Sequence, residues 1–575
     1  MPSIIQLARI VWKHLPKAYR FRCCVLLAML FFGTLLEMLG IGMVIPIVLL
    51  LSSKNISAKF PQLVPWLEFF GNPSHEALIV GGMVLLVSTF CFKSGFLGLM
   101  AWKQAQFVFS LQAYFSQRLF EGYLRQPYIF HLRHNSAKLI RNVTMESSEL
   151  VNKALMPGML LITELLAMAG IALLLLVIEP LGMILLFFFI GLALWIFQRF
   201  TQDRLVKWGA KRQYHDGRRM RHLQQGLGGA KEIKLLGREE AFIRDFQADA
   251  LGAAMVGQKQ TTLNHLPRLW LEMLGVIGLA GLVFVIMGQG KEVGTLLPTI
   301  GVFAAAAFRL MPSANRVLSS LQFLKFSTPV VKLLDEELGR LAPPHGDESV
   351  PVPFRNELRF KGVAFRYPDA DKDVLDRIEL SIKRGTSVGF VGSSGAGKST
   401  LVNILLGLLT PTAGSVEVDG LDIQANLRGW QNQLGYVPQS IFLIDDSLRR
   451  NVAFGLENDR IDEGAVWNAI RAAQLETFVR ELPEGLETRV GERGVRLSGG
   501  QMQRIGIARA LYHNPQVLVM DEATSALDND TERGVMEAIK ALHGRMTILI
   551  VAHRLTTIEH CDKVYCLENG ICTLV

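Results

Sequence analysis

Six long apolar stretches in the first part of the chain constrain its fold more than any other feature. They occupy residues 23–51, 77–100, 154–178, 181–200, 269–287 and 296–310. Each is near the roughly 20 residues that a helix needs to cross the hydrocarbon core of a bilayer. Half of the residues are apolar, only 19% are charged, and the mean hydropathy is +0.29. This is too apolar for a soluble protein, and we predict a polytopic α-helical membrane domain with six spans.

The charges between these stretches predict how the spans are oriented. The segments rich in Lys and Arg are those before residue 23, from 102 to 153, from 199 to 268, and after 311. The remaining connections, 52–76, 179–180 and 288–295, are short or poor in basic residues. By the positive-inside rule both termini are cytoplasmic, and we expect a multi-pass membrane protein. The two long basic connections should be helical extensions of the spans that turn near residues 130–141 and 221–231.

Residues 1–22 combine apolar side chains, Trp12 and five basic residues after position 8, which predicts an amphipathic elbow helix in the cytoplasmic interface. No short apolar segment with a small-residue cleavage site precedes the first span, so no cleaved signal peptide is expected. The formal charge of +9 does not predict a nucleic-acid partner, because the basic residues flank apolar spans. The six cysteines lack metal-ligand spacing, and we expect buried, reduced thiols.

A proline-rich polar segment separates this region from the rest of the chain. Residues 341–354 contain four prolines, and alternating strands and helices begin at Glu357. We therefore predict four parts: the elbow helix at 1–22, the six-span domain with cytoplasmic extensions at 23–340, the linker at 341–354, and an α/β P-loop nucleotide-binding domain at 355–575.

The most specific motif of the chain is G-x-x-x-x-G-K-[ST], which follows a β-branched strand at 388–391 and opens an apolar helix. Its glycines let the backbone point N–H groups at phosphate oxygens, and the helix N-terminus adds its dipole. Lys398 is placed to reach the β- and γ-phosphates, and the Ser399 hydroxyl is placed to bind Mg²⁺. The predicted phosphate-binding residues are Gly392, Ser393, Ser394, Gly395, Ala396, Gly397, Lys398, Ser399 and Thr400.

Four further residues carry the chemistry expected around a bound nucleotide. Asp521 and Glu522 end an apolar strand, where Asp521 suits Mg²⁺ and Glu522 suits polarisation of the attacking water. Gln439 follows a strand and could ligate Mg²⁺ and position water, although a lone loop glutamine is usually inert. His553 follows the strand at 547–551 and is placed to contact the γ-phosphate.

Two other motifs predict contacts with the nucleotide. Tyr367 lies some 25 residues before the phosphate loop and could stack on adenine, although a tyrosine there could also be an ordinary strand aromatic. Ser498, Gly499, Gly500 and Gln501 open a helix rich in Arg and Ala. A helix N-terminus of this composition is a second anion site, or else a plain N-cap.

Together these motifs closely resemble those of the ABC ATPase family over residues 355–570. The resemblance implies that residues 392–400 form the Walker A loop, that residues 497–501 form the signature, and that Asp521 and Glu522 are the Walker B pair. It also implies that Tyr367 belongs to the A-loop, Gln439 to the Q-loop and Asp528 to the D-loop at 525–528, and that His553 is the switch histidine. In this family ATP lies between the Walker A loop of one domain and the signature of another. The chain has one copy of each, so the resemblance implies a dimer, most simply a homodimer.

The order of the parts resembles an ABC exporter half-transporter, in which six spans precede the ATPase domain. Residues 490–494, just before the signature, resemble the X-loop of these exporters. The short helical tail that usually follows the strand at 563–568 is not in this sequence, which leaves any role for it open. The resemblance implies an ATP hydrolase coupled to transport, with ATP and Mg²⁺ as cofactors.

Three cationic residues within or beside the spans bear on the substrate: Lys93, Arg268 and Arg309. At a rise of ~1.5 Å per residue, Lys93 and Arg309 lie ~20 Å or slightly more from the outer face, and Arg268 ~30 Å from it. Basic side chains in the inner half of a cavity suit an anionic, amphipathic substrate with a diphosphate headgroup. The alternative is local pairing, because Glu272 follows Arg268 by one helical turn, and Glu37 and Glu164 could neutralise the others.

Four stretches resemble those of PglK-type lipid-linked oligosaccharide flippases: 52–76, 135–136, 139–146 and 229–239. The first of them could be a short external interfacial helix. This resemblance implies ATP-driven flipping of a polyprenyl-diphosphate-linked oligosaccharide, for glycosylation, from the cytoplasmic to the outer leaflet. A multidrug or lipid A exporter of the same architecture is the main alternative. A peptide exporter is disfavoured because no peptidase domain precedes the spans. A non-transporting ABC channel or regulator is disfavoured because Glu522 and Ser498 are both present.

Overall fold

The computed structural model describes residues 4–43, 74–178, 180–288, 293–341, 352–523, 529–540, 542–552 and 558–575. The chain divides into two compact units. A helical unit comprises Met1–Gln126 with Arg133–Pro344, and an α/β unit comprises Pro127–Leu132 with His345–Val575. The division between 344 and 345 falls within the segment that the prolines single out as a linker, of which 342–351 lie outside the described residues.

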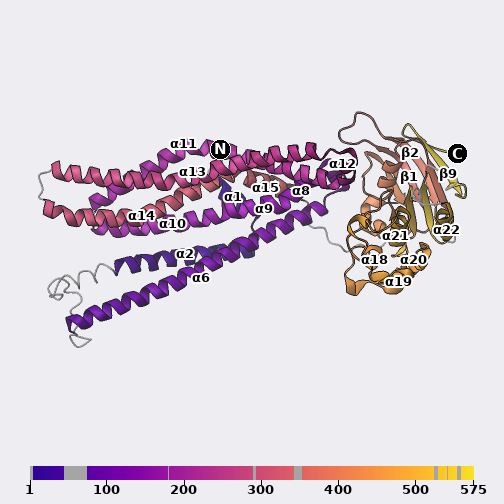
Figure 1. The fold of residues 1–575 in the computed structure, drawn as a ribbon. Coiled ribbons are helices and arrows are strands. Elements are labelled where there is room, and N and C mark those ends of the chain that lie inside the picture. Colours follow the sequence, from indigo (N-terminus) through magenta and orange to yellow (C-terminus); the bar gives the residue numbers. More distant parts are fainter. Residues whose placement is uncertain are drawn as a thin grey trace. The chain divides into compact units, whose positions relative to one another are not determined.

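The helical unit is a bundle of long helices that run side by side (Figure 1). Its helices, with the short π-helical turns η2 and η3, are α1 (Ile4–His14), α2 (Lys17–Gly42), α6 (His75–Leu124), α8 (Ser136–Arg141), η2 (Asn142–Glu146), α9 (Ser147–Leu150), η3 (Val151–Leu155), α10 (Met156–Ile178), α11 (Pro180–Gly228), α12 (Ala230–Leu236), α13 (Glu239–Gly288), α14 (Val293–Phe326) and α15 (Thr328–Arg340). The helix α2 packs on α6 and α10, α10 packs on α14, and α11 packs on α13 and α14.

Apart from Met43, which follows α2, and residues 154–155, which belong to η3, the described part of each of the six apolar stretches lies within α2, α6, α10, α11, α13 or α14. Among the described residues, three segments are long and apolar enough to cross a membrane: Lys17–Gly40, His75–Leu124 and Ser136–Leu173. The apolar parts of α11, α13 and α14 include many side chains outside the described set. The polar external segment expected at 52–76 lies outside the described residues up to position 73.

Three helices are far longer than a bilayer requires. The helices α6 and α13 have 50 residues each and α11 has 49. At ~1.5 Å per residue each spans ~75 Å, more than twice the thickness of a hydrocarbon core. The prediction that the spans continue as helices beyond the membrane is therefore confirmed. The first turn falls where it is expected, at α7 (Tyr128–Arg133) and α8 after α6. The second lies later than the expected 221–231, because α11 continues to Gly228 and the connection to α13 runs over 229–238 and contains α12.

The N-terminal helix differs from the prediction of one amphipathic helix over 1–22. The helix α1 ends at His14, and a second helix, α2, starts at Lys17. Pro16 lies between them, and proline has no N–H to donate to a continuing helix and instead favours the first turn of a new one. The end of α1 is attached to α15, because the His14 imidazole hydrogen-bonds to Asp335 at 2.7 Å and Lys13 reaches the same carboxylate at 3.4 Å.

The α/β unit contains two sheets. A four-stranded antiparallel sheet has the order β2-β1-β4-β5, and a six-stranded sheet has the order β10-β9-β3-β8-β7-β6. The strands are β1 (Glu357–Phe365), β2 (Leu375–Lys383), β3 (Ser387–Val391), β4 (Ala413–Val418), β5 (Leu421–Asp422), β6 (Leu434–Val437), β7 (Val517–Asp521), β8 (Thr547–Val551), β9 (Lys563–Glu568) and β10 (Ile571–Leu574). In the second sheet only β10 is antiparallel to its neighbour.

The helices of this unit are α7 (Tyr128–Arg133), α16 (Lys398–Leu405), α17 (Leu427–Gln431), α18 (Leu448–Val452), α19 (Glu463–Ala472), α20 (Glu476–Glu481), α21 (Gly499–Leu511) and α22 (Asn529–Lys540). Strands β7 and β8 are buried along their whole length, which is typical of parallel strands covered on both faces. Trp430 is fully buried in the core and donates its indole N–H to the carbonyl oxygen of Leu405 at 2.7 Å.

The order of the parallel strands determines where the expected catalytic residues lie. The carboxyl ends of parallel strands meet at one edge of a sheet, and ligands of open α/β sheets bind there. The phosphate loop follows β3, Asp521 and Glu522 end or follow β7, and Gln439 follows β6 closely. These residues, distant in sequence, are therefore gathered at one edge.

Candidate ATP site and substrate cavity

The phosphate loop connects β3 to α16 through glycines with backbone angles that other residues rarely adopt. Gly392, Gly395 and Gly397 have φ values of +147°, +82° and +102°. A Cβ on Gly392 would lie 2.2 Å from the carbonyl oxygen of Leu567 on the adjacent strand β9. The first glycine is therefore required by close packing of the loop against the sheet, and the following ones by the turn that exposes backbone N–H groups.

Lys398 begins helix α16 and is buried, with 7% of its surface exposed. Its ammonium donates to the carbonyl oxygens of Gly392 at 2.7 Å and Ser393 at 3.0 Å. Within the described part of the chain no carboxylate pairs with this cation. A buried ammonium held only by carbonyl groups inside a glycine-rich loop fits the negative charge of nucleotide phosphates.

Tyr367 lies beside the same helix. Its hydroxyl is 3.2 Å from the hydroxyl oxygen of Thr400, and its ring contacts Phe365 edge-on with 4.9 Å between centroids. The ring is partly exposed, so one face can receive a planar group while the hydroxyl fixes its position. The contact places the predicted adenine-stacking residue next to the phosphate loop, which the sequence separation alone does not establish.

The carboxylates at the end of β7 meet the glutamine that follows β6. The Gln439 side-chain amide donates to Glu522 at 2.7 Å. Glu522 has a positive φ of 50°, and its backbone N–H donates to the carbonyl oxygen of Val551 at 3.0 Å. Asp521 is buried. Burial of the Tyr436 hydroxyl, together with the negative charge of Asp521, raises the pKa of that hydroxyl to about 12. The residues predicted to polarise and position water are therefore in contact.

The oxygen donors expected to hold Mg²⁺ fit that ion. The Ser399 hydroxyl is exposed at the start of α16, Asp521 supplies a carboxylate, and Gln439 supplies an amide oxygen. These are the hard oxygen ligands that Mg²⁺ takes, usually together with waters and substrate phosphates. No cluster of three or more His, Cys, Asp or Glu side chains suited to a metal ion occurs among the residues that the structure describes.

The signature segment forms a complete helix cap. Ser498 is the N-cap of α21 and accepts from the backbone N–H of Gln501 at 3.2 Å, while the Gln501 side chain accepts from the backbone N–H of Ser498 at 2.8 Å. The structure therefore shows the N-cap, while anion binding at the N-terminus of this helix, beside Gly499 and Gly500, stays a prediction. Two expected site residues, Asp528 and His553, lie outside the described residues.

The three expected substrate-cavity cations do not form one cluster in the described part of the helical unit. The Lys93 ammonium lies over the Phe90 ring, 4.1 Å from its centroid. Arg268 pairs with Glu272 at 2.8 Å, which is the local pairing considered as the alternative. The side chain of Arg309 lies outside the described residues.

A cavity of about 430 Å³ nevertheless joins Arg268 to a residue that the sequence analysis does not single out. Its walls come from α13 and α14 and include Arg268, Asn315 and Arg316. Arg316 forms a two-pronged ion pair with the buried Glu164 of α10, with Arg316 Nη2 3.1 Å from Glu164 Oε2. Arg316 lies less than two helical turns beyond Leu310, where the last apolar stretch ends, and an arginine this close to a predicted span is the sequence signal for the site.

A bundle of membrane-length helices joined to an α/β unit with this phosphate loop, carboxylate pair and signature cap defines an ATP-driven membrane transporter. The sequence matches the family described as the ABC transporter transmembrane region over residues 30–295 and the ABC transporter family over residues 375–525.

Similar proteins of known name agree with this class. The ATP-dependent lipid A-core flippase of Thiobacillus denitrificans is 30% identical over 497 residues, covering 86% of this chain and 83% of that protein. The protein of the same name from Bordetella avium is 29% identical, covering 86% and 82%. A solved structure of a bacterial Atm1-family ABC exporter with ATP bound has a TM-score of 0.78, with 22% identity and coverage of 97% and 95%.

The chain belongs to the ABC exporters, as a half-transporter with one membrane domain and one ATPase domain. The expected fold and the ATPase activity coupled to transport are confirmed. The sequence analysis predicts a lipid-linked oligosaccharide flippase and gives a lipid A exporter as an alternative. The names of the relatives favour that alternative.

Proposed function

We propose that two copies of this chain form an ATP-driven flippase that moves a phosphorylated glycolipid of the lipid A-core class from the cytoplasmic to the outer leaflet of a bacterial inner membrane. The observation that carries the proposal is the similarity to lipid A-core flippases over 86% of the chain, which includes both units. Family matches fall in both units, over residues 30–295 of the membrane unit and 375–525 of the ATPase unit.

The ATPase site supports the dimeric part of the proposal. The Walker A loop at 392–400 and the signature cap at Ser498 each occur once in the chain. In the proposed dimer, the Ser498 hydroxyl and the N-terminus of α21 face the phosphates of an ATP that is bound to the Walker A loop of the other copy. With Asp528 and His553 taken from the family pattern, each ATP site is completed by residues of both copies, with Mg²⁺ held by Ser399, Gln439 and Asp521.

The cavity between α13 and α14 supports an anionic amphipathic substrate. Its two arginines, Arg268 and Arg316, each already hold one carboxylate and retain further N–H donors for phosphate oxygens. Both pairs are exposed enough to rearrange, since the Arg268 side chain is 73% exposed and the Arg316 side chain is 44% exposed. Lys93, on α6, and Arg309, on α14, are the further basic residues that the sequence offers for an anionic substrate.

The decisive experiment compares two lipids in proteoliposomes that contain the purified full-length protein. ATP-driven flipping and ATPase stimulation are measured with rough-type lipid A-core and, separately, with a polyprenyl-diphosphate-linked oligosaccharide. We expect lipid A-core to be flipped and to stimulate ATP hydrolysis. Flipping of the polyprenyl lipid alone would restore the oligosaccharide function, and flipping of neither would refute the proposal.

Two substitutions connect the mechanism to the structure. Glu522→Gln keeps the Gln439 contact possible but removes the carboxylate expected to polarise water, so ATP should bind while flipping is lost. Arg316→Ala should reduce lipid stimulation of the ATPase while leaving basal hydrolysis unchanged. Arg244→Ala, an exposed arginine elsewhere on α13, is the matched control and should leave lipid stimulation intact.

A further inference from the structure

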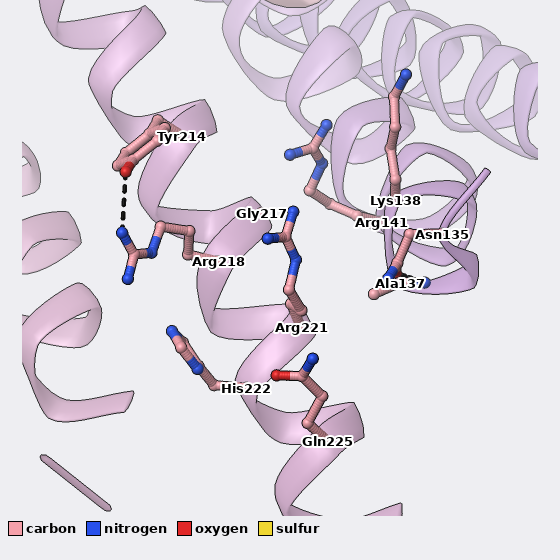
Figure 2. A pocket seen from close by; sticks show the side chains of 10 residues that line it. All are labelled: Asn135, Ala137, Lys138, Arg141, Tyr214, Gly217, Arg218, Arg221, His222 and Gln225. Carbon is pink, nitrogen blue, oxygen red and sulfur yellow. Dashed lines mark hydrogen bonds between the residues drawn. The ribbon is translucent and has the colours of Figure 1, made fainter. Parts of the chain in front are cut away.

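A second, larger cavity lies in the cytoplasmic extensions of the helical unit, apart from the cavity between α13 and α14. It measures about 680 Å³ and lies between α8 and the last four turns of α11 (Figure 2). Its ten lining residues include four Lys or Arg and one His but no Asp or Glu. The basic residues are Lys138, Arg141, Arg218, Arg221 and His222. A cavity of this size exceeds what a single water or monovalent ion needs and lies within the usual range for small-molecule sites.

Arg141 is built into the wall of this cavity. Its side chain is buried, with 8% of the residue exposed, and its Nη1 donates to the carbonyl oxygen of Gln213 at 3.1 Å. Gly217 makes this position possible, because a Cβ at Gly217 would lie 2.3 Å from Arg141 Nη1. The Nε of Arg141 is 3.4 Å from Glu146 but makes no hydrogen bond within the described part of the chain. The guanidinium is therefore fixed in place with donor capacity left over.

The part of the wall on α11 is positioned by one carboxylate, that of Asp249. Asp249 of α13 is 4% exposed and accepts from Arg218 at 2.9 Å and from the rings of His215 at 2.9 Å and His222 at 3.1 Å. Burial raises the pKa of Asp249, but the hydrogen bonds from His215 and the other groups outweigh it and keep that pKa below its ordinary value. One ionised carboxylate therefore orients three basic groups, two of which line the cavity.

Arg221 completes the set. It lies one turn after Arg218 on α11, is exposed, and has no ion pair within the described residues. In Figure 2 its guanidinium extends toward that of Arg141, whereas the Arg218 guanidinium turns toward the Tyr214 hydroxyl, to which it donates at 3.0 Å. Lys138 is 3.4 Å from Glu337, its one described carboxylate partner. The net charge of the lining is therefore positive, and no Asp or Glu is among the lining residues.

We propose that this cavity binds a phosphate-bearing anion with at least two negative charges, of the diphosphate class. Arginine forks match phosphate oxygens in pairs, and several of them around one concavity favour a multiply charged group over a chloride or a single carboxylate. The same chemistry could be presented by a soluble diphosphate or by a phosphorylated lipid headgroup. Because the walls come from α8 and α11, which adjoin the first and second cytoplasmic turns, the bound anion ties these two connections together.

The test uses the full-length protein and the arginine reagent phenylglyoxal, with labelling of Arg221 read by mass spectrometry. All samples contain Mg²⁺ and a saturating non-hydrolysable ATP analogue, so that the phosphate loop is filled and does not compete for the probe. One arm adds inorganic pyrophosphate to protein in neutral detergent. A second arm compares nanodiscs of phosphatidylcholine alone with nanodiscs that also contain phosphatidic acid, whose phosphomonoester headgroup carries up to two negative charges, without pyrophosphate.

We expect at least about fivefold slower labelling of Arg221 in one arm, and the arm in which it occurs identifies the source as soluble or lipid. Arg204, an exposed arginine on α11 outside the cavity, should label equally in every sample. Gly217→Ala should abolish the protection by displacing Arg141 without removing a charge. Gly228→Ala is the matched control on the same helix, because a Cβ there meets nothing within 4 Å.

Three results would overturn the proposal. The first is unprotected labelling of Arg221 in both arms. The second is protection that survives in Gly217→Ala, which would place the anion elsewhere. The third is an Arg221 that is unreactive before any anion is added, which would show that carboxylates of a second copy already fill the cavity.

Discussion

The phosphate loop offers a sharp test of the structure because two of its glycines share a positive φ but differ in what surrounds them. Gly392 and Gly395 both have positive φ, at +147° and +82°. A Cβ on Gly392 would come within 2.2 Å of the Leu567 carbonyl oxygen, whereas a Cβ on Gly395 meets nothing within 4 Å. Substitution by alanine should therefore strain the backbone at both positions but create a collision at Gly392 alone.

The magnitudes follow from these two terms. Backbone strain at a positive φ costs about 1–2 kcal/mol for a residue with a Cβ. The Cβ of Gly392→Ala would have to move roughly 1 Å from a strand that is paired directly with β3, and overpacking of that kind costs about 1–3 kcal/mol more. At ~2 kcal/mol of difference, the unfolding midpoint of a domain of 150–250 residues falls by about 4–8 °C more for Gly392→Ala than for Gly395→Ala.

The assay is thermal unfolding of the full-length protein in detergent, followed by a probe of the α/β unit and repeated with an ATP analogue. Gly392→Ala should show the larger loss of midpoint and the larger loss of the ATP-induced rise in midpoint. If the two alanine variants unfold at the same temperature, the close approach of the loop to Leu567 does not limit this position and the reasoning fails.

Three further predictions address other parts of the α/β unit. Burial raises the pKa of the Asp419 carboxyl, but hydrogen bonds from the backbone N–H groups of residues 355–357 outweigh burial and lower that pKa. The stabilisation of the fold by this carboxylate is therefore present above about pH 4 and is lost as the pH falls through the pKa of the folded state. Asp419→Asn should cost about 1 kcal/mol at pH 7 and flatten acid unfolding below pH 4, as measured by thermal melts across pH 3–7. Ser498→Ala removes a helix cap and should lower stability by about 1 kcal/mol, with a larger effect on ATP turnover than on stability if the cap also contacts phosphate; unchanged turnover would leave the cap purely structural. Glu522→Gln should slow ATP hydrolysis about 10²- to 10⁴-fold at unchanged ATP affinity in a steady-state phosphate-release assay, and near-normal hydrolysis would exclude Glu522 as the base.

The ATPase half of the protein could be predicted closely because its constraints are local. Strands end where the motifs begin, and the predicted strands at 547–551 and 563–568 coincide with β8 and β9. The hydrogen bond between Gln439 and Glu522 could not be predicted, since it depends on β6 and β7 being neighbours in the sheet. Sequence order does not fix that neighbourhood, because some 80 residues separate the two strands.

The membrane half was less predictable for the same physical reason. Apolar length indicates spans, and one-turn spacing raised the pairing of Arg268 with Glu272 as the alternative to a cavity role, which is the pairing that the structure shows. The ion pair between Arg316 and Glu164 joins two helices 152 residues apart, so no local pattern reveals it. The basic cavity likewise combines α8 with α11 and depends on Gly217 as much as on the arginines. Such sites arise from packing, which periodicity does not specify.

The six residues Pro127–Leu132 belong to the α/β unit although the chain on both sides of them belongs to the helical unit. Ile129 packs against the same apolar cluster that contains Phe390 and Trp430. The ATPase unit is therefore discontinuous in sequence, and cutting the gene at residue 345 does not yield the whole of it. A recombinant fragment of 345–575 would leave an uncovered apolar patch prone to self-association. Chimaeras between relatives should therefore take residues 127–132 and 345–575 from the same parent, so that the hexapeptide and the apolar cluster that it covers remain matched.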